Sequence, residues 1–241
     1  MTIKVFSRIE KKYLITPEDK KALIKTIKQY LEKDLYFRSK VFNLYFDTDN
    51  YDLITQSIDW VDFKEKVRAR SYGGYDCVFL EIKTKVKGKE DSLGYKRRIM
   101  ITRDDFAELV AGQTTLTKLA ARSVEQSTDF QIAREVEYLI THFNLKPKIL
   151  VMYNRESYKG ADGLRITFDE KLSYRDHNLK FIKHKNDKMY FKDDHNIIME
   201  IKTPEALPLW LVKKLSELKL YPRRFSKIGN IYQSLRKEQN V

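Results

Sequence analysis

The sequence is poor in the residues that mark secreted, fibrous or membrane-spanning proteins. It has one cysteine, Cys77, among 241 residues, so no disulfide can form within the chain, and we expect a reducing, cytoplasmic location. Only 8 glycines and 5 prolines occur, which leaves no low-complexity linker and indicates a single domain over residues 1–241. No run of 18 apolar residues exists and the first residues lack a signal-peptide pattern, so we expect no membrane span.

Positive charge is what the chain has in excess. Lysine and arginine number 47 against 34 aspartates and glutamates, giving a formal net charge of +13. Hydrophobic residues make up 42%, enough to build a sizeable core. The balance indicates an acidic partner, such as nucleic acid, anionic lipid or a phosphorylated small molecule.

Alternating apolar and charged residues predict an α+β fold dominated by antiparallel strands. Thr16, Pro17 and Asp19 predict the start of a helix, as its N-cap, first residue and capping-box partner. Spacing of three and four residues predicts further helices within 103–143 and at the C-terminal end, whereas 48–52 has the composition of a loop. The predicted strands are 8–15, 40–47, 63–74, 75–86, 95–102, 147–158, 164–175 and 196–203.

Charged residues recur at every second position in these strands, so they share one face of each strand. Two arrangements fit this pattern. Each charged face meets water separately, or the strands close into a barrel whose charged faces line a lumen, with helices outside. A lumen needs a ligand or water, because buried like charges repel. The pattern is carried by Glu10-Lys12, Glu81-Lys83, Glu200-Lys202, Arg68-Arg70, Lys96-Arg98 and Arg165-Asp169.

Such a lining, basic with a few carboxylates, suits a polyanion bound together with a divalent metal. The sequence contains no Walker A loop, no Ser-His-Asp pattern and no zinc-spaced Cys/His pattern. Phosphate chemistry that relies on charge neutralisation rather than on a covalent nucleophile is therefore the leading hypothesis.

Eight ordered segments, covering almost the whole chain, resemble the catalytic domain of the vacuolar transporter chaperone (VTC) family. This family belongs to the triphosphate tunnel metalloenzymes, relatives of the CYTH domain. The resemblance implies a closed antiparallel β-barrel and a polyphosphate polymerase that uses ATP with Mn²⁺ or Mg²⁺. The segments are RIEKKYLI, KVRARSY, FLEIKTK, YKRR, MYNRESY, LRITFDEKL, IMEIKTP and RRFSKIGNIY.

The resemblance also implies roles for individual residues. Catalytic groups would be Lys83, Lys96, Arg155 and Lys202. Substrate-binding groups would be Lys12, Arg68, Arg70, Arg98, Arg165, Ser226 and Lys227. Glu200 would hold the metal, with Glu10 and Glu81 as further candidate ligands. CYTH-type triphosphatases usually begin with Glu-x-Glu-x-Lys, whereas Arg8 stands at the first glutamate position here, which favours the VTC branch.

Two other classes of function stay open. The same tunnel could hydrolyse inorganic or nucleoside triphosphates, or the chain could be a non-enzymatic module that binds polyanions. Nucleic acid is not expected, because lining carboxylates repel its backbone and the aromatic residues fall mainly on opposite faces. We expect ATP, triphosphate and polyphosphate as ligands. Eukaryotic members carry membrane helices that this sequence lacks, which leaves room for a membrane-protein partner, and the sequence does not indicate an oligomeric state.

Overall fold

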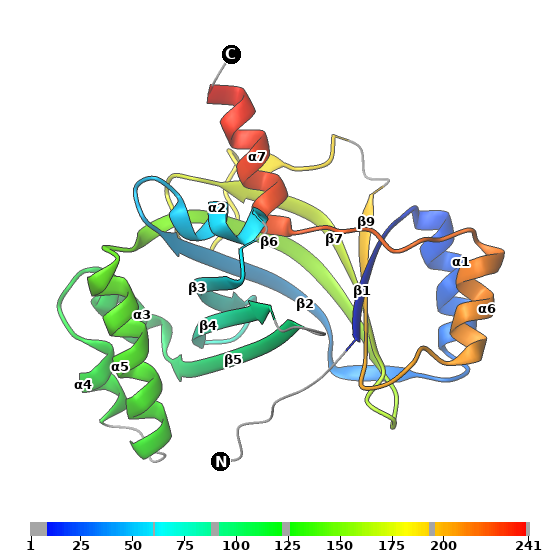
Figure 1. Cartoon of the computed structure of the whole chain (residues 1–241), viewed down its shortest axis with the longest axis horizontal. Helices are drawn as coiled ribbons and strands as arrows, with labels where there is room; N and C mark the ends of the chain where they lie inside the picture. The colour runs from blue at the N-terminus through cyan, green and yellow to red at the C-terminus, as the bar shows by residue number, and fades with distance from the viewer. Residues whose placement is uncertain (1–8, 60, 88–91, 122–125, 193–195, 240–241) are drawn as a thin grey trace.

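The computed structural model describes residues 9–59, 61–87, 92–121, 126–192 and 196–239. One antiparallel sheet, in the order β1-β9-β7-β6-β2-β3-β4-β5, organises the fold, and a short strand β8 pairs with β7 (Figure 1). The strands are β1 (Ile9–Ile15), β2 (Glu32–Asp47), β3 (Phe63–Tyr72), β4 (Val78–Lys87), β5 (Ser92–Ile101), β6 (Lys146–Lys159), β7 (Arg165–Arg175), β8 (Lys188–Met189) and β9 (Ile197–Thr203). The helices are α1 (Pro17–Ile27), α2 (Asp52–Ile58), α3 (Arg103–Val110), α4 (Leu116–Ala120), α5 (Gln126–His142), α6 (Leu209–Glu217) and α7 (Lys227–Gln239). Arg8 lies outside the described residues.

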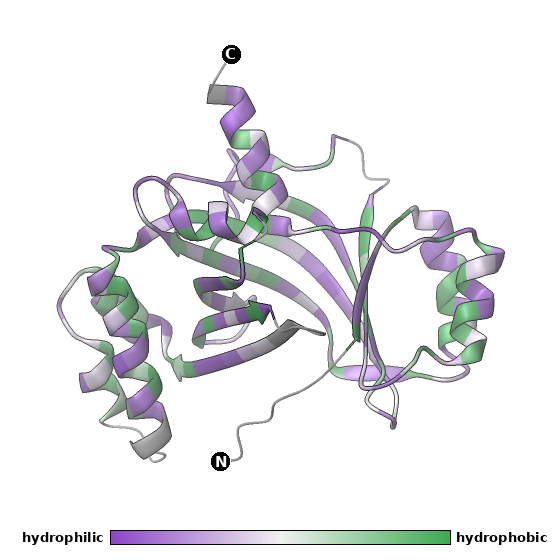
Figure 2. Cartoon of the chain, viewed as in Figure 1, coloured by the Kyte–Doolittle hydropathy of each residue, from purple (hydrophilic) through white to green (hydrophobic). Residues whose placement is uncertain are grey.

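The sheet is bent into a trough with helices outside it. In Figure 1, β3–β5 form one side, β9 and β1 form the other, and β2, β6 and β7 join them. Hydrophilic (purple) and hydrophobic (green) residues alternate along the strands, as Figure 2 shows. This alternation gives the sheet one apolar face and one polar face.

The apolar, convex face holds the fold together. Val67 and Leu80 are fully buried in a cluster that includes residues of α3, α4 and α5. On the other side, Leu23 of α1 and Leu211 of α6 are fully buried against β1, β7 and β9. Each such side chain contributes about 1.5–3 kcal/mol when it is removed from water.

Helix α7 covers one end of the concave face. Ile231 of α7 is buried in a cluster with Val151, Leu172 and Ile198, which lie on β6, β7 and β9. A shift in the β6–β7 register, accompanied by a positive φ of 53° at Lys171, brings apolar residues onto this part of the concave face. The concave side is thus apolar beneath α7 and charged along the rest of its length.

The prediction of an α+β fold with a large antiparallel sheet is confirmed, but that of a closed barrel is not. Within the described ranges, no strand pairing joins β1 to β5, so hydrogen bonds do not close the curved sheet. The segment before α7 runs beside β1 instead. The backbone N–H of Arg223 donates to the carbonyl oxygen of Lys12 at 2.7 Å, and Nζ of Lys12 donates to the carbonyl oxygen of Phe225 at 3.1 Å. This segment uses a backbone acceptor of β1 that a closing strand would need.

Two local predictions had different outcomes. The capping box at α1 is confirmed, since Thr16 Oγ1 accepts the N–H of Asp19 at 3.1 Å and the Asp19 carboxylate accepts the N–H of Thr16 at 3.0 Å. The loop prediction for 48–52 is confirmed for residues 48–51, whereas α2, which begins at Asp52, was not predicted. Asp47 was the signal, because its fully buried carboxylate accepts the backbone N–H of Thr48, Leu53 and Ile54 at 2.8, 2.9 and 2.8 Å.

We expect Asp47→Ala to lower the free energy of unfolding by about 2–3 kcal/mol, because three backbone donors lose a charged acceptor in a buried place. Chemical denaturation measures this loss. Asp49→Ala is the control, since the exposed carboxylate of Asp49 pairs with Lys146 and Lys148 and its loss should change the midpoint little. Equal effects of the two changes would show that Asp47 does not anchor α2.

Candidate functional site

The charged residues that the sequence singles out converge on the concave face. Strand neighbours of opposite parity, such as Val67 and Ile82, are buried against the helices, which leaves the charged positions on the inner side. Lys83 of β4 lies close enough to Glu10 of β1 for the two charges to interact across the trough. The residues brought together are Glu10 and Lys12 (β1), Arg68 and Arg70 (β3), Glu81 and Lys83 (β4), Lys96 and Arg98 (β5), Arg155 (β6), Arg165 (β7), Glu200 and Lys202 (β9), and Lys227 (α7).

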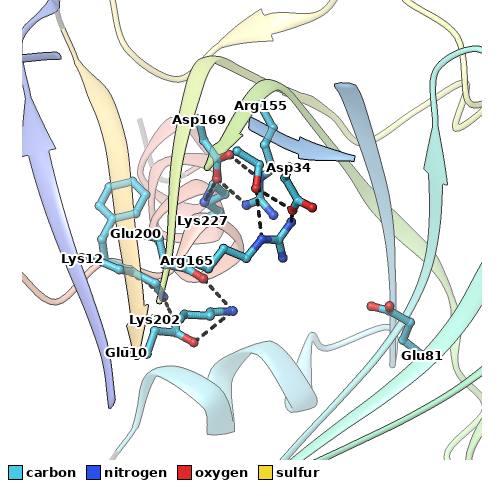
Figure 3. Close-up of polar contacts among 12 residues, drawn as sticks. Glu10, Lys12, Asp34, Glu81, Arg155, Arg165, Asp169, Glu200, Lys202 and Lys227 are labelled. Atoms are coloured by element: carbon cyan, nitrogen blue, oxygen red, sulfur yellow. Dashed lines mark hydrogen bonds and ion pairs between the residues drawn. The ribbon is translucent and has the colours of Figure 1, made fainter. Parts of the chain in front are cut away.

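The part of the trough formed by β1, β9, β7 and β6, together with Asp34 of β2 and Lys227 of α7, pairs its cations with carboxylates, and we call it the paired wall (Figure 3). Nζ of Lys202 lies 2.7 Å from Glu200 and 3.4 Å from Glu10. Nζ of Lys12 lies 3.2 Å from Glu10. Burial raises the pKa of Glu200, but Lys202 and Lys12, with other cations nearby, lower that pKa far below its usual range. Glu200 is therefore ionised at any physiological pH.

Asp169 is the second centre of the paired wall. Its fully buried carboxylate accepts two hydrogen bonds from Arg155, at 2.6 and 2.7 Å, and lies 2.7 Å from Nζ of Lys227. Burial alone raises the pKa of Asp169, yet Arg155 and Lys227 lower it overall. Arg165 is placed in the same way by Asp34, at 3.1 Å. These contacts fix the guanidinium groups in space before any ligand arrives.

The opposite side, formed by β3, β4 and β5, is the cationic wall. Glu81 is buried there and contacts Nε of Arg68 at 2.7 Å and Nζ of Lys96 at 2.5 Å. Burial raises the pKa of Glu81, but Arg68, Arg70 and Lys96 together lower it to about 2. Figure 3 shows Glu81 across the trough from the paired wall.

Lys66 belongs to the cationic wall and was not singled out from the sequence. The strand register places Lys66 opposite Lys83, and Lys83 opposite Lys96, in one row across β3, β4 and β5. Burial and nearby cations lower the pKa of Lys66 and that of Lys96 to about 8 each. The signal in the sequence was its position two residues before Arg68, on the same strand face.

Tyrosine rings lie beneath several of the cations. Tyr153 lies 5.2 Å from the guanidinium of Arg155 and 4.9 Å from Nζ of Lys227. The hydroxyl of Tyr45 lies 3.4 Å from Nη1 of Arg68. Burial raises the pKa of Tyr45, but Arg68 and further cations lower it to about 8. The face of Tyr153 adds to the stabilisation that Asp169 gives Arg155 and Lys227.

Ser226 acts on the backbone of α7. Its Oγ accepts the N–H of Gly229 at 3.2 Å, and its own N–H donates to Oδ1 of Asn230 at 3.1 Å. This reciprocal capping fixes the first turn of α7, and with it the position of Lys227.

Two carboxylates of the paired wall, Glu10 and Glu200, lie close enough together to be candidate ligands of a divalent cation. Glu10 and Glu200 lie on neighbouring strands and both contact Lys202. Burial and the charge of Glu200 raise the pKa of Glu10, but Lys202, Lys12 and Lys83 lower it overall. In the described part of the chain, no group of three acidic, histidine or cysteine side chains converges. The protein would therefore supply one or two carboxylates, and phosphate oxygens and water would complete the shell, as is usual for Mg²⁺.

Comparison with known proteins matches this chain to a family model and to a curated relative. A family model described as the VTC domain matches residues 7–236. Subunit 4 of the vacuolar transporter chaperone complex of Trypanosoma brucei brucei is 25% identical over 203 residues, which are 70% of this chain and 26% of that protein. The chain thus spans about a quarter of the length of this relative.

Solved structures share the fold at low sequence identity. A proposed adenylyl cyclase from Hippeastrum, described as having a dominant triphosphatase activity, superimposes with a TM-score of 0.55 at 18% identity, over 94% of this chain and 96% of that one. A proposed adenylate cyclase from Bacillus halodurans gives a TM-score of 0.52 at 14% identity, over 91% and 93% of the two chains. No helix in the described ranges has the length and apolarity needed to cross a bilayer.

The lowered pKa of Glu81 predicts an acid-dependent loss of stability. Because this pKa falls from 4.5 to about 2 on folding, the stabilisation is present above pH 4.5 and is lost as the pH falls through 2. We expect Glu81→Gln to flatten the decline of the unfolding free energy between pH 4.5 and 2, measured by urea denaturation. Glu217→Gln, at the exposed surface of α6, is the control. A decline in Glu81→Gln as steep as in the unmodified protein would contradict this assignment.

Proposed function

Since this chain belongs to the VTC domain family, we propose that it is a polyphosphate polymerase that transfers the γ-phosphate of ATP to the end of an inorganic polyphosphate chain. The observation that carries the proposal is the trough itself. Its concave face gathers arginines and lysines from separate strands, holds many of them in place through a few carboxylates and supports them with tyrosine rings. Such a surface neutralises and orients a polyanion, and phosphoryl transfer needs little else from a protein.

In the proposed reaction, a terminal oxygen of polyphosphate attacks the γ-phosphorus of ATP. The bond from that phosphorus to the β–γ bridging oxygen breaks, ADP leaves, and the chain grows by one phosphate. Arg68, Arg70 and Arg155 would bind phosphate oxygens bidentately, while Lys83, Lys96 and Lys202 would spread the developing charge. The nucleophile belongs to the substrate, so the protein needs no catalytic serine, cysteine or histidine.

A divalent cation would be held by Glu200, with Glu10 as its neighbour. When bound there, Mn²⁺ or Mg²⁺ would supply Lewis-acid chemistry and neutralise part of the charge of the phosphates. Glu200 already contacts Lys202, so Lys202 would share the carboxylate with the cation or turn toward phosphate. Glu81 is engaged by Arg68 and Lys96, which makes it the weaker candidate as a ligand.

Hydrolysis is the second candidate function, supported by the fold shared with the Hippeastrum protein. Water would then attack the same phosphorus. The products would be orthophosphate and ADP, or orthophosphate and pyrophosphate from inorganic triphosphate. The similar trypanosome protein is named as a subunit of a complex, so we also propose partner proteins for this chain, with ATP, triphosphate and polyphosphate as its ligands.

The purified protein incubated with ATP and Mn²⁺ should yield polyphosphate, visible on a gel. Arg155→Ala should lose at least about tenfold in yield, because charge-assisted bonds of about 1.5–3 kcal/mol disappear. Lys183→Ala, in an exposed loop segment, is the matched loss of one positive charge and should keep full yield. Release of orthophosphate without polyphosphate would favour the hydrolase. Binding of ATP without turnover would favour a binding module.

We expect Glu200→Gln to weaken metal-dependent turnover while keeping the fold. The amide preserves shape but removes the charge that a hard cation requires. Titration of Mn²⁺ against activity should show a higher half-saturating concentration in the variant, with an unchanged circular dichroism spectrum as the folding control. Identical titrations for the two proteins would leave Glu200 as a counter-ion of Lys202.

A further inference from the structure

Carboxylates are distributed unevenly over the concave face. The paired wall has nearly one carboxylate for each cation, whereas on the cationic wall Glu81 is the sole carboxylate in the three rows from Arg70 to Lys66. The cations of the cationic wall are Lys66, Arg68, Arg70, Lys83, Lys96 and Arg98. On the paired wall, Lys12, Arg155, Arg165, Lys202 and Lys227 face Glu10, Asp34, Asp169 and Glu200. The unbalanced positive charge therefore lies on β3–β5.

The row formed by Lys66, Lys83 and Lys96 concentrates this imbalance. These lysines are direct partners across neighbouring strands, where like charges destabilise a sheet. Within the described ranges, Lys66 and Lys83 form no ion pair or side-chain hydrogen bond, and Lys96 contacts only Glu81. Stability of the fold does not account for such a row, whereas an anion bound along it would.

The dimensions of the row select for an elongated anion. Neighbouring strands lie about 4.8 Å apart, so three lysines on adjacent strands span about 10 Å. A linear chain of several phosphates can contact all three ammonium groups at once. A single phosphate group can reach only one or two of them.

We propose that Lys66 is a substrate-binding residue, and that the row Lys66–Lys83–Lys96 holds a linear phosphate chain across β3, β4 and β5. The proposal deepens the proposed function, since it assigns the chain to one wall of the same trough. It depends on binding alone, so it can be tested without turnover.

The surroundings of Lys66 provide a second readout. Burial, Lys83 of β4, Lys12 of β1 and Arg68 of its own strand lower the pKa of Lys66 to about 8, while Tyr45 of β2 opposes this shift. Between pH 8 and 9, much of Lys66 is therefore neutral in the free protein. A bound anion restores the ordinary affinity for the proton, so binding takes up protons in this range.

The test is calorimetric titration of the whole chain with inorganic tripolyphosphate, pyrophosphate and orthophosphate, without metal. Lys66→Met should weaken tripolyphosphate binding about tenfold and should weaken pyrophosphate binding less. At pH 8.5, titrations in buffers of different ionisation enthalpy should show that Lys66→Met takes up fewer protons on binding tripolyphosphate than the unmodified protein does. Lys11→Met is the matched control, because Lys11 is exposed and adjoins Lys12 on the opposite strand face. Lys66→Arg keeps the charge and should retain binding, which separates lost charge from lost folding.

Equal weakening for all three phosphates, or an effect of Lys66→Met no larger than that of Lys11→Met, would overturn the proposal. This result can be distinguished from a result that contradicts the proposed polymerase function. A protein that binds tripolyphosphate through Lys66 but makes no polyphosphate contradicts the proposed function and leaves the lysine row intact. A polymerase in which Lys66→Met binds tripolyphosphate normally contradicts only the row.

Discussion

Repulsion among the cations of the concave face is the constraint on which the rest of the structure depends. Lys66, Lys83 and Lys96 lie in one row, and their lowered pKa values record the cost of holding positive charge there. Asp169 and Glu81 offset part of this cost at the arginines, and their own pKa values fall as a result. The positive charge that these carboxylates do not neutralise favours the binding of an anion.

The opposite face of the sheet makes this arrangement tolerable. Helices α3–α5 and the pair α1 and α6 bury the convex side, and α7 fills the apolar end of the concave side. Stability thus comes from the convex face and from the apolar end beneath α7, which leaves the rest of the concave face free to carry charge that weakens the fold. The capped start of α7 also sets Lys227 beside Asp169, so the helix that closes one end contributes a cation to the trough.

The period-two charge pattern predicted that the charged side chains share one face of each strand, and it left open whether these faces meet water separately or line a lumen. Arg68, Arg155 and Glu200 come from distant strands, yet alternation alone places each on the same face. Closure of the sheet could not be predicted in this way. It depends on the edge of β1, where Lys12 contacts Phe225 over a separation of 213 residues. Lys66 was missed because strand register, rather than composition, makes it part of a row. Ser226, which the resemblance assigned to substrate binding, caps the first turn of α7.

The location of a bound phosphate chain tests the account most directly. A crystal structure with tripolyphosphate and Mn²⁺, with anomalous scattering used to place the metal, would show it. The account predicts phosphate oxygens between the cationic wall and Arg155, in contact with Lys66, Lys83 and Lys96, and manganese beside Glu200. Phosphate on the convex or outer surface, or manganese remote from Glu200, would contradict it.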